Sequence, residues 1–189
     1  MPVQTDESPS RVQTHESPSR VSTATRAFGG SAVALVVAGT VALLTRQPWL
    51  FPSLGPAVML HIEQPDKPES SPRNTVIGHL VALLAGYAML VVTGLADNPS
   101  ALQEGFSVPR IIAAAGSLAI TAAVLVLLNA AHPPAGATTL IVGLGLLKTP
   151  TQLVIAFAAV VLVTVVDLLF NRSTGRKMPV WRAPAAKEE

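Results

Sequence analysis

His132-Pro133-Pro134 stands in the middle of a long stretch without formal charge, and its residue types are the best suited to chemistry in this sequence. Residues 111–147 contain no Asp, Glu, Lys or Arg. Histidine alone among the side chains titrates near neutrality, so at membrane depth His132 can pair with an anion or pass a proton. The alternative is an N-cap that only satisfies the local backbone. His132 is therefore the first residue to test for function.

The two prolines predict a break between helices. Proline lacks an amide hydrogen and clashes with the preceding turn, so the arriving helix should end near residues 129–131. Proline also fits the first turn of a new helix, which we expect to begin at Pro133 or Pro134. Because a bilayer cannot satisfy bare backbone, the break must line a protein or water cavity. The positive end of the new helix should attract an anion through free amide groups and hydroxyls, namely those of Ala135, Gly136, Ala137, Thr138 and Thr139.

A second segment repeats this pattern earlier in the chain. Residues 52–56 (Pro-Ser-Leu-Gly-Pro) and residues 133–137 (Pro-Pro-Ala-Gly-Ala) both read Pro-x-x-Gly followed by a small residue or proline. A single segment of this kind is explained by a kink that lets helices pack. Two matching segments favour two broken helices whose N-terminal ends face a shared polar site, with Ser53 and Gly55 contributing from the first.

Other polar residues lie in or beside apolar stretches. For His61, Glu63 and His79, a structural role explains the position at least as well as a functional one. Asp167 is expected near the membrane interface, paired with Arg172 or with a neighbouring helix. No metal site and no cofactor are expected, because no two histidines have the i, i+3 or i, i+4 spacing that holds an ion on a helix face.

Basic residues flank the apolar stretches. Their default role is snorkelling toward the membrane surface, and the functional alternative is a vestibule that attracts anions. The residues concerned are Arg46, Arg73, Arg110 and Lys148.

The elements that must position these residues are hydrophobic helices. The chain is 50% hydrophobic and only 13% charged, against about 25% charged for an ordinary soluble domain. Four stretches without charge are long enough to cross a bilayer, and two shorter ones begin close to prolines. We therefore predict an all-α transmembrane bundle of four long helices, at 27–45, 75–96, 111–131 and 149–166, and two short broken helices, at 49–62 and 133–147.

Three regions are predicted along the chain. Residues 1–26 are polar, contain a near-duplicate segment and are expected to be disordered. Residues 27–171 form the transmembrane domain, with repeat halves at about 27–96 and 108–171. Residues 172–189 form a basic tail. Nothing in the sequence resembles a nucleic-acid-binding motif, so the expected surroundings are the lipid bilayer.

Each half of this domain reads as long helix, short broken helix, long helix. If the short helices cross the membrane, the second half is inverted relative to the first, as in many transporters. If they dip in and return, the chain has four crossings and parallel repeats. Either layout makes both termini cytoplasmic in the cell membrane, because of the basic cluster Arg172, Arg176, Lys177 and Arg182. We prefer the inverted layout, which also places Lys67 and Arg73 inside.

Taken together, these motifs resemble the HPP family of integral membrane proteins over about residues 27–170. The resemblance rests on 51–57 (Phe-Pro-Ser-Leu-Gly-Pro-Ala), 71–74 (Ser-Pro-Arg-Asn), 78–79 (Gly-His) and 131–138 (Ala-His-Pro-Pro-Ala-Gly-Ala-Thr). It implies a membrane protein usually described with four spans, and an anion permease, since some members are linked to nitrite transport. The residues that carry over are His132, Pro133, Pro134, Gly136, Thr138, Pro52, Ser53, Gly55, Pro56, Arg73, Asn74 and His79.

The preferred hypothesis is therefore a small-anion transporter, with nitrite as a candidate substrate, and a homo-oligomer would suit so thin a bundle. One alternative is a membrane scaffold or sensor without flux. A second is an intramembrane hydrolase that uses Ser53, a histidine and Asp167, but no nucleophile motif is present. We therefore expect no enzymatic activity.

Overall fold

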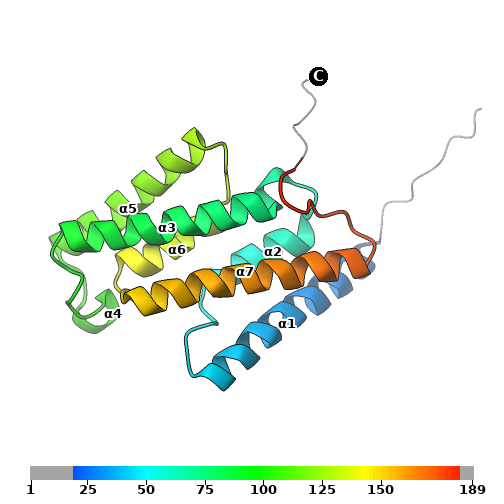
Figure 1. The fold of residues 1–189 in the computed structure, drawn as a ribbon, viewed down its shortest axis with the longest axis horizontal. Coiled ribbons are helices and arrows are strands. Elements are labelled where there is room, and N and C mark those ends of the chain that lie inside the picture. Colours follow the sequence, from blue (N-terminus) through cyan, green and yellow to red (C-terminus); the bar gives the residue numbers. More distant parts are fainter. Residues whose placement is uncertain (1–18, 184–189) are drawn as a thin grey trace, which may run out of the picture.

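The computed structural model describes residues 19–183, and the regular elements in that range are helices (Figure 1). Four of them are long and apolar enough to cross a membrane, which confirms the predicted all-α bundle. These are α1 (Arg20–Thr45), α3 (Pro72–Val92), α5 (Val108–Leu127) and α7 (Pro150–Ser173). The shorter elements are α2 (Leu54–Glu63), η1 (Pro68–Ser70), α4 (Ala101–Glu104) and α6 (Pro134–Gly143).

Hydroxyl residues define where the long helices begin. Ser19, Ser71, Ser107 and Thr149 each accept a hydrogen bond from the backbone N–H three residues later. After each of the last three caps, a proline stands in the first turn, where its missing N–H costs nothing. This combination starts α3 and α5 three residues before the predicted stretches, whereas α7 begins one residue after the predicted start at 149.

The helix α1 begins at Arg20, so residues 20–26 are not the disordered segment that their composition predicted. Arg26 donates hydrogen bonds to the backbone oxygen of Ile62 and, at 3.1 Å, to Oδ1 of Asn171. These partners come from α2 and α7 and satisfy a guanidinium that would otherwise oppose helix formation beside the bilayer. Residues 1–18, the rest of the predicted tail, lie outside the described residues.

The segment after α7 also departs from the prediction of a tail. The side chain of Met178 is buried, and the Nδ2 group of Asn171 lies 3.6 Å from its sulfur. The backbone N–H of Arg73 donates to the oxygen of Trp181 at 3.0 Å. Met178 therefore packs against the end of α7, and Trp181 is bonded to the start of α3.

The two short helices run in opposite directions. The C-terminal end of α2 lies beside Arg26 and Asn171, at the end of the bundle where α1 begins and α7 finishes. The C-terminal end of α6 lies at the other end, where Leu144 accepts a backbone hydrogen bond from Ala101 of α4 (Figure 1). The C-terminal ends of α2 and α6 therefore lie at opposite ends of the bundle.

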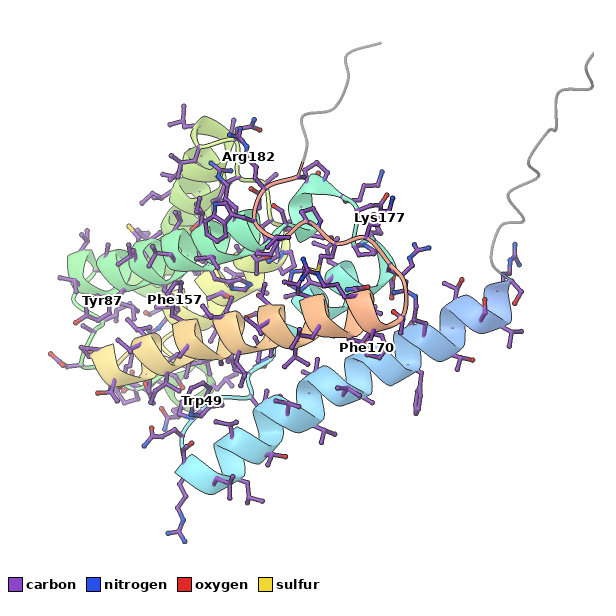
Figure 2. All side chains as sticks on the ribbon, turned by 45° about the vertical axis from the view of Figure 1, so that its right-hand side comes forward. Trp49, Tyr87, Phe157, Phe170, Lys177 and Arg182 are labelled. Atoms are coloured by element: carbon purple, nitrogen blue, oxygen red, sulfur yellow. The ribbon has the colours of Figure 1, made fainter. Side chains whose placement is uncertain are left out.

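Small residues allow the helices of the core to approach closely. A Cβ atom on Gly86 of α3 would lie 2.6 Å from Cβ of Val142 in α6, so only glycine fits there. By contrast, α1 lies along one edge of the bundle, and most of its side chains point away from the other helices (Figure 2). Its buried residues are Gly30, Ala34 and Ala38, and the remaining apolar face is suited to lipid.

Arg110 does not extend into solvent, as snorkelling would require. Its side chain is 2% exposed, and its Nη2 group donates to the backbone oxygen of Pro99 at 2.6 Å. The guanidinium also approaches Gly145, which has a positive φ of 77° and no side chain to obstruct it. Arg110 therefore braces the loops beside α4.

Candidate functional site

A row of buried polar side chains crosses the centre of this apolar bundle. None of them is more than 2% exposed, and each contacts the next. We call it the polar chain, and its members in spatial order are Ser53, Thr138, His79, His132, Thr75, His61 and Asp167. Buried polar groups are expensive within a bilayer and are retained chiefly for function, so this chain is the candidate site.

The central part of the polar chain joins the two short helices through α3. Oγ of Ser53 lies 2.6 Å from Oγ1 of Thr138, and that hydroxyl lies 2.7 Å from Nδ1 of His79. Nε2 of His79 lies 3.2 Å from Nε2 of His132. The site is therefore made by residues from α3, from α6 and from the segments that precede α2 and α6.

A backbone carbonyl sets the direction of these hydrogen bonds. Nδ1 of His132 lies 2.8 Å from the oxygen of Glu69, which can only accept, so this nitrogen carries a hydrogen. In the neutral ring, Nε2 of His132 is then an acceptor for the Nε2–H of His79. Nδ1 of His79 in turn accepts from the hydroxyl of Thr138, and that oxygen accepts from Ser53. Every hydrogen bond in the neutral central part therefore points from Ser53 toward Glu69.

The peripheral part of the polar chain runs to α7. Oδ2 of Asp167 lies 2.8 Å from Nδ1 of His61, and Nε2 of His61 lies 2.8 Å from Oγ1 of Thr75. The link to the central part is longer, since Oγ1 of Thr75 lies 3.5 Å from Nδ1 of His132. Oδ1 of Asp167 is buried and has no hydrogen-bond partner among the described residues.

The backbone of α3 is shaped to receive His132. Thr75 and His79 are four residues apart, so both face the same side of this helix. Gly78 lies on the same helix, where an added Cβ would come within 2.9 Å of Cβ of His132. Gly78 therefore provides the space in which the His132 ring reaches His79.

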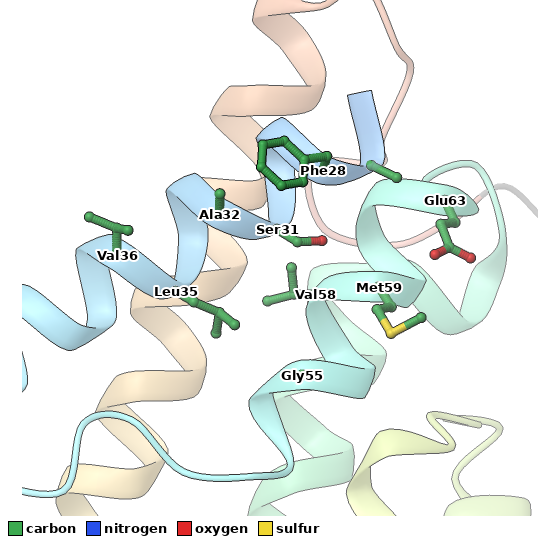
Figure 3. Close-up of a pocket in the computed structure, with 10 residues that line it drawn as sticks. Phe28, Ser31, Ala32, Leu35, Val36, Gly55, Val58, Met59 and Glu63 are labelled. Atoms are coloured by element: carbon green, nitrogen blue, oxygen red, sulfur yellow. The ribbon is translucent and has the colours of Figure 1, made fainter. Parts of the chain in front are cut away.

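Hollows lie beside the polar chain. One of about 250 Å³ lies between α5 and α6 and is lined by His132, Pro133 and Gly136. Another of about 440 Å³ separates part of α2 from the start of α6. A larger groove of about 680 Å³ lies between α1 and α2, with Phe28, Leu35, Val58 and Met59 on its walls and Glu63 at its rim (Figure 3). Apart from Ser31 and Glu63, the residues that line this last groove are apolar, so it is not suited to an anion.

A comparison with known protein families matches residues 16–179 to the family described as HPP, transmembrane region. The chain belongs to the HPP family. Searches of curated proteins and of solved structures found no match. Together with the four long apolar helices, the family establishes a multi-pass membrane protein that sits in a lipid bilayer.

In this HPP protein, the family motifs do not all reach the polar chain. Of the residues predicted from the motifs, Ser53, His79, His132 and Thr138 are members. Pro133 and Pro134 begin α6, as predicted, whereas Gly136 faces Leu118 of α5 and Gly55 lines the groove between α1 and α2. The two exposed prolines of the first motif, Pro52 and Pro56, flank the start of α2.

Arg73 and Asn74 support the site from outside it. The guanidinium of Arg73 donates to the backbone oxygens of Leu128 and Asn129, at 3.2 Å and 3.1 Å. The side-chain amide of Asn74 donates to the oxygen of Ala131 at 3.3 Å. Both residues therefore stabilise the turn that precedes His132. Asn129 in this turn has a positive φ of 46°.

The prediction of free amide groups at the start of α6 is wrong for Ala135 and Gly136. The N–H groups of Ala135 and Gly136 donate to the oxygens of His132 and Pro133, each at 3.0 Å. A tight turn before the helix supplies these acceptors, which the prolines alone did not reveal. Thr139 also lies outside the polar chain, because its hydroxyl bonds to Thr121 and to the oxygen of Ala135.

Asp167 is fully buried, and of its two expected partners it contacts the neighbouring helix, through His61, rather than Arg172. The sequence analysis also missed Thr75 and Asn171. Asn171 donates to the backbone oxygens of His61 and Asp167, at 3.0 Å and 2.9 Å, and so fixes that pair. A sequence signal for these two residues was available. Thr75 is four residues from His79 and Asn171 is four residues from Asp167, so each pair lies on one face of an apolar helix.

Proposed function

We propose that this HPP protein transports a small anion across the membrane, and that the central part of the polar chain is its substrate site. The observation that carries the proposal is the contact between Ser53, the N-cap of α2, and Thr138 of α6, two short helices that run in opposite directions. Transporters place their sites near the bilayer midplane, where broken helices meet. His79 and His132 complete such a site here.

The chemistry of the central part favours an anion. Its side chains offer hydroxyl and imidazole donors and contain no carboxylate. Both short helices begin beside it, so the positive ends of their dipoles also favour negative charge. Nitrite is the first substrate to test, because some members of the HPP family are linked to its transport.

The direction of the short helices supports six crossings and an inverted repeat. If α2 with residues 46–53 and α6 with residues 128–133 each span the bilayer, the chain crosses three times in each half. Both termini then lie on one side, and the basic residues Arg172, Arg176 and Lys177 make that side cytoplasmic. This layout is part of the proposal.

Transport requires the short helices to separate. Ser53 and Thr138 contact one another directly, so an anion can bind between them only if α2 and α6 move apart. The groove of about 440 Å³ between these helices shows that they are not packed along their whole length. A rocking motion of one half against the other would open the site to each side in turn.

A hydrolase is less well supported than a transporter. Ser53 contacts Thr138 rather than a histidine, and Asp167 contacts His61, whose other nitrogen meets the fully buried hydroxyl of Thr75. We therefore propose no catalytic role for either hydroxyl.

Purified protein in lipid vesicles tests the proposed function. Nitrite uptake should exceed the uptake of protein-free vesicles, which measures nitrous acid crossing the lipid by itself. His132→Ala should lower the protein-dependent rate by about tenfold or more, since it removes a hydrogen-bonding group from the site. Uptake equal to that of protein-free vesicles would reject nitrite transport. A scaffold or sensor would leave permeability unchanged in every variant.

A further inference from the structure

The anion site uses only the central part of the polar chain and leaves Thr75, His61 and Asp167 without a role. We infer that these residues conduct a proton between the Asp167 end of the bundle and the anion site, so that the anion crosses together with a proton. The inference rests on the proposed function and adds the co-transported ion. Rows of histidine and carboxylate side chains are a known means of passing protons within membranes.

The central part can accept a proton without any change of partners. A proton that binds Oγ of Ser53 releases the hydrogen already there to Oγ1 of Thr138. That hydroxyl passes its own hydrogen to Nδ1 of His79, and the Nε2–H of His79 passes to Nε2 of His132. The product is a His132 ring that carries hydrogen on both nitrogens, so one positive charge has moved from Ser53 to His132. The distances that this step needs are 2.6, 2.7 and 3.2 Å.

The second step carries the proton to Asp167. The Nδ1–H of His132 turns from the oxygen of Glu69 to Oγ1 of Thr75 and transfers its hydrogen there. Thr75 turns its own hydrogen from the backbone oxygen of Ser71, 3.1 Å away, and passes it to Nε2 of His61, and the Nδ1–H of His61 passes to Oδ2 of Asp167. The charge on His132 and the charge on the carboxylate are both neutralised, and no electron is transferred. The reverse sequence delivers a proton from Asp167 to the anion site.

The second step requires His132 to change its hydrogen-bond partner. Nδ1 of His132 lies 2.8 Å from the oxygen of Glu69 but 3.5 Å from Oγ1 of Thr75. A carbonyl cannot pass a proton onward, so His132 conducts only when its ring leaves Glu69 for Thr75. Because His132 also borders the anion site, a movement that opens that site would shift this choice of partner. Proton transfer is thereby tied to the transport cycle.

The charged groups nearest the Asp167 end are two arginines. Arg26 of α1 reaches Asn171 beside Asp167, and Arg176 lies within electrostatic range of Arg26. The contact of the polar chain with η1 is through the backbone oxygen of Glu69, which does not titrate. The helix α6 contains no titratable residue. The unpaired Oδ1 of Asp167 also argues against a purely structural network, which would leave no buried acceptor unsatisfied.

Thr75 allows a selective test, because Thr75→Val keeps the shape of the side chain and removes the hydroxyl link between His61 and His132. Thr75→Ser keeps a hydroxyl at the same place. Thr164→Val is the matched control, since Thr164 is also buried in a long helix but bonds only to the oxygen of Val160. Thermal unfolding in detergent shows whether each variant is folded.

The experiment records nitrite uptake and internal pH together in vesicles whose membrane potential is clamped with valinomycin, after subtraction of protein-free vesicles. Wild type should take up about one proton per nitrite and respond to an imposed pH gradient. In Thr75→Val the acceleration by that gradient should fall by about tenfold or more, while Thr75→Ser and Thr164→Val retain it.

The results that would overturn the inference are distinguishable from those that would overturn the proposed function. Nitrite uptake by wild type without proton uptake, or a Thr75→Val variant that still responds to the pH gradient, would remove the proton pathway and leave the anion site. No nitrite uptake above protein-free vesicles would remove the proposed substrate and the coupling with it. A merely structural Thr75 would lower the unfolding temperature of Thr75→Val without changing the ratio of protons to nitrite.

Discussion

The Nε2 atoms of His79 and His132 lie 3.2 Å apart at the centre of the bundle, so while both rings are neutral only one of these nitrogens carries a hydrogen. The carbonyl of Glu69 decides which, because it requires a hydrogen on Nδ1 of His132. A backbone group of η1 therefore sets the donor and acceptor pattern as far as Ser53. The predictions below test this arrangement and the elements that hold it.

Gly78→Ala should disturb the site without touching a polar group. The added Cβ would meet Cβ of His132 at 2.9 Å and Cβ of Ala135 at 3.3 Å. We expect a loss of about 1–3 kcal/mol in the free energy of unfolding, the usual cost of overpacking, together with slower nitrite uptake. Gly39→Ala is the control, since its Cβ would meet only Leu50 at 3.8 Å. Equal unfolding temperatures for the two variants would contradict the close approach.

Arg73→Ala should loosen the turn that leads to His132. It removes hydrogen bonds from a charged group to Leu128 and Asn129, each worth about 1.5–3 kcal/mol when buried and less where exposed. The expected outcome is a lower unfolding temperature and faster backbone hydrogen exchange in residues 128–132. Arg172→Ala, which removes an exposed arginine, should change neither measurement. Unchanged exchange in Arg73→Ala would show that other contacts hold the turn.

The crossing pattern can be read with single cysteines, because the natural chain contains none. With six crossings and cytoplasmic termini, Lys67→Cys faces the cytoplasm and Glu104→Cys faces outward. A membrane-impermeant maleimide applied to intact cells should therefore label only the second variant. Four crossings with parallel repeats would reverse the result, so labelling of Lys67→Cys alone would reject the inverted layout.

The helices were predictable because their signals are local. Long apolar stretches without charge identified the four long helices, and the prolines at 133 and 134 correctly located the start of α6. The start of α1 was not predictable in this way. The Ser19 cap at its start lies in a polar segment without an apolar period, and the partners of Arg26, Ile62 and Asn171, meet it only in the folded bundle.

The site was only partly predictable for the same reason. Ser53, Thr138 and His132 could be found because each stands at a helix break. The pairing of His61 with Asp167 joins residues 106 positions apart, so it depends on how α2 and α7 pack. The amides of Ala135 and Gly136 were expected to bind an anion, but the preceding turn satisfies them. Side chains, rather than free backbone groups, form the proposed site.

The central claim is that the hydroxyl of Thr138 belongs to the anion site, and neighbouring threonines test it most directly. Thr138 and Thr139 are both fully buried in α6, but only Thr138 contacts Ser53 and His79, whereas Thr139 contacts Thr121. The decisive measurement is the initial rate of nitrite uptake into vesicles that contain Thr138→Val or Thr139→Val. We predict a fall of about tenfold or more for Thr138→Val, and a rate within about twofold of wild type for Thr139→Val. Equal rates for the two variants would contradict the proposed site.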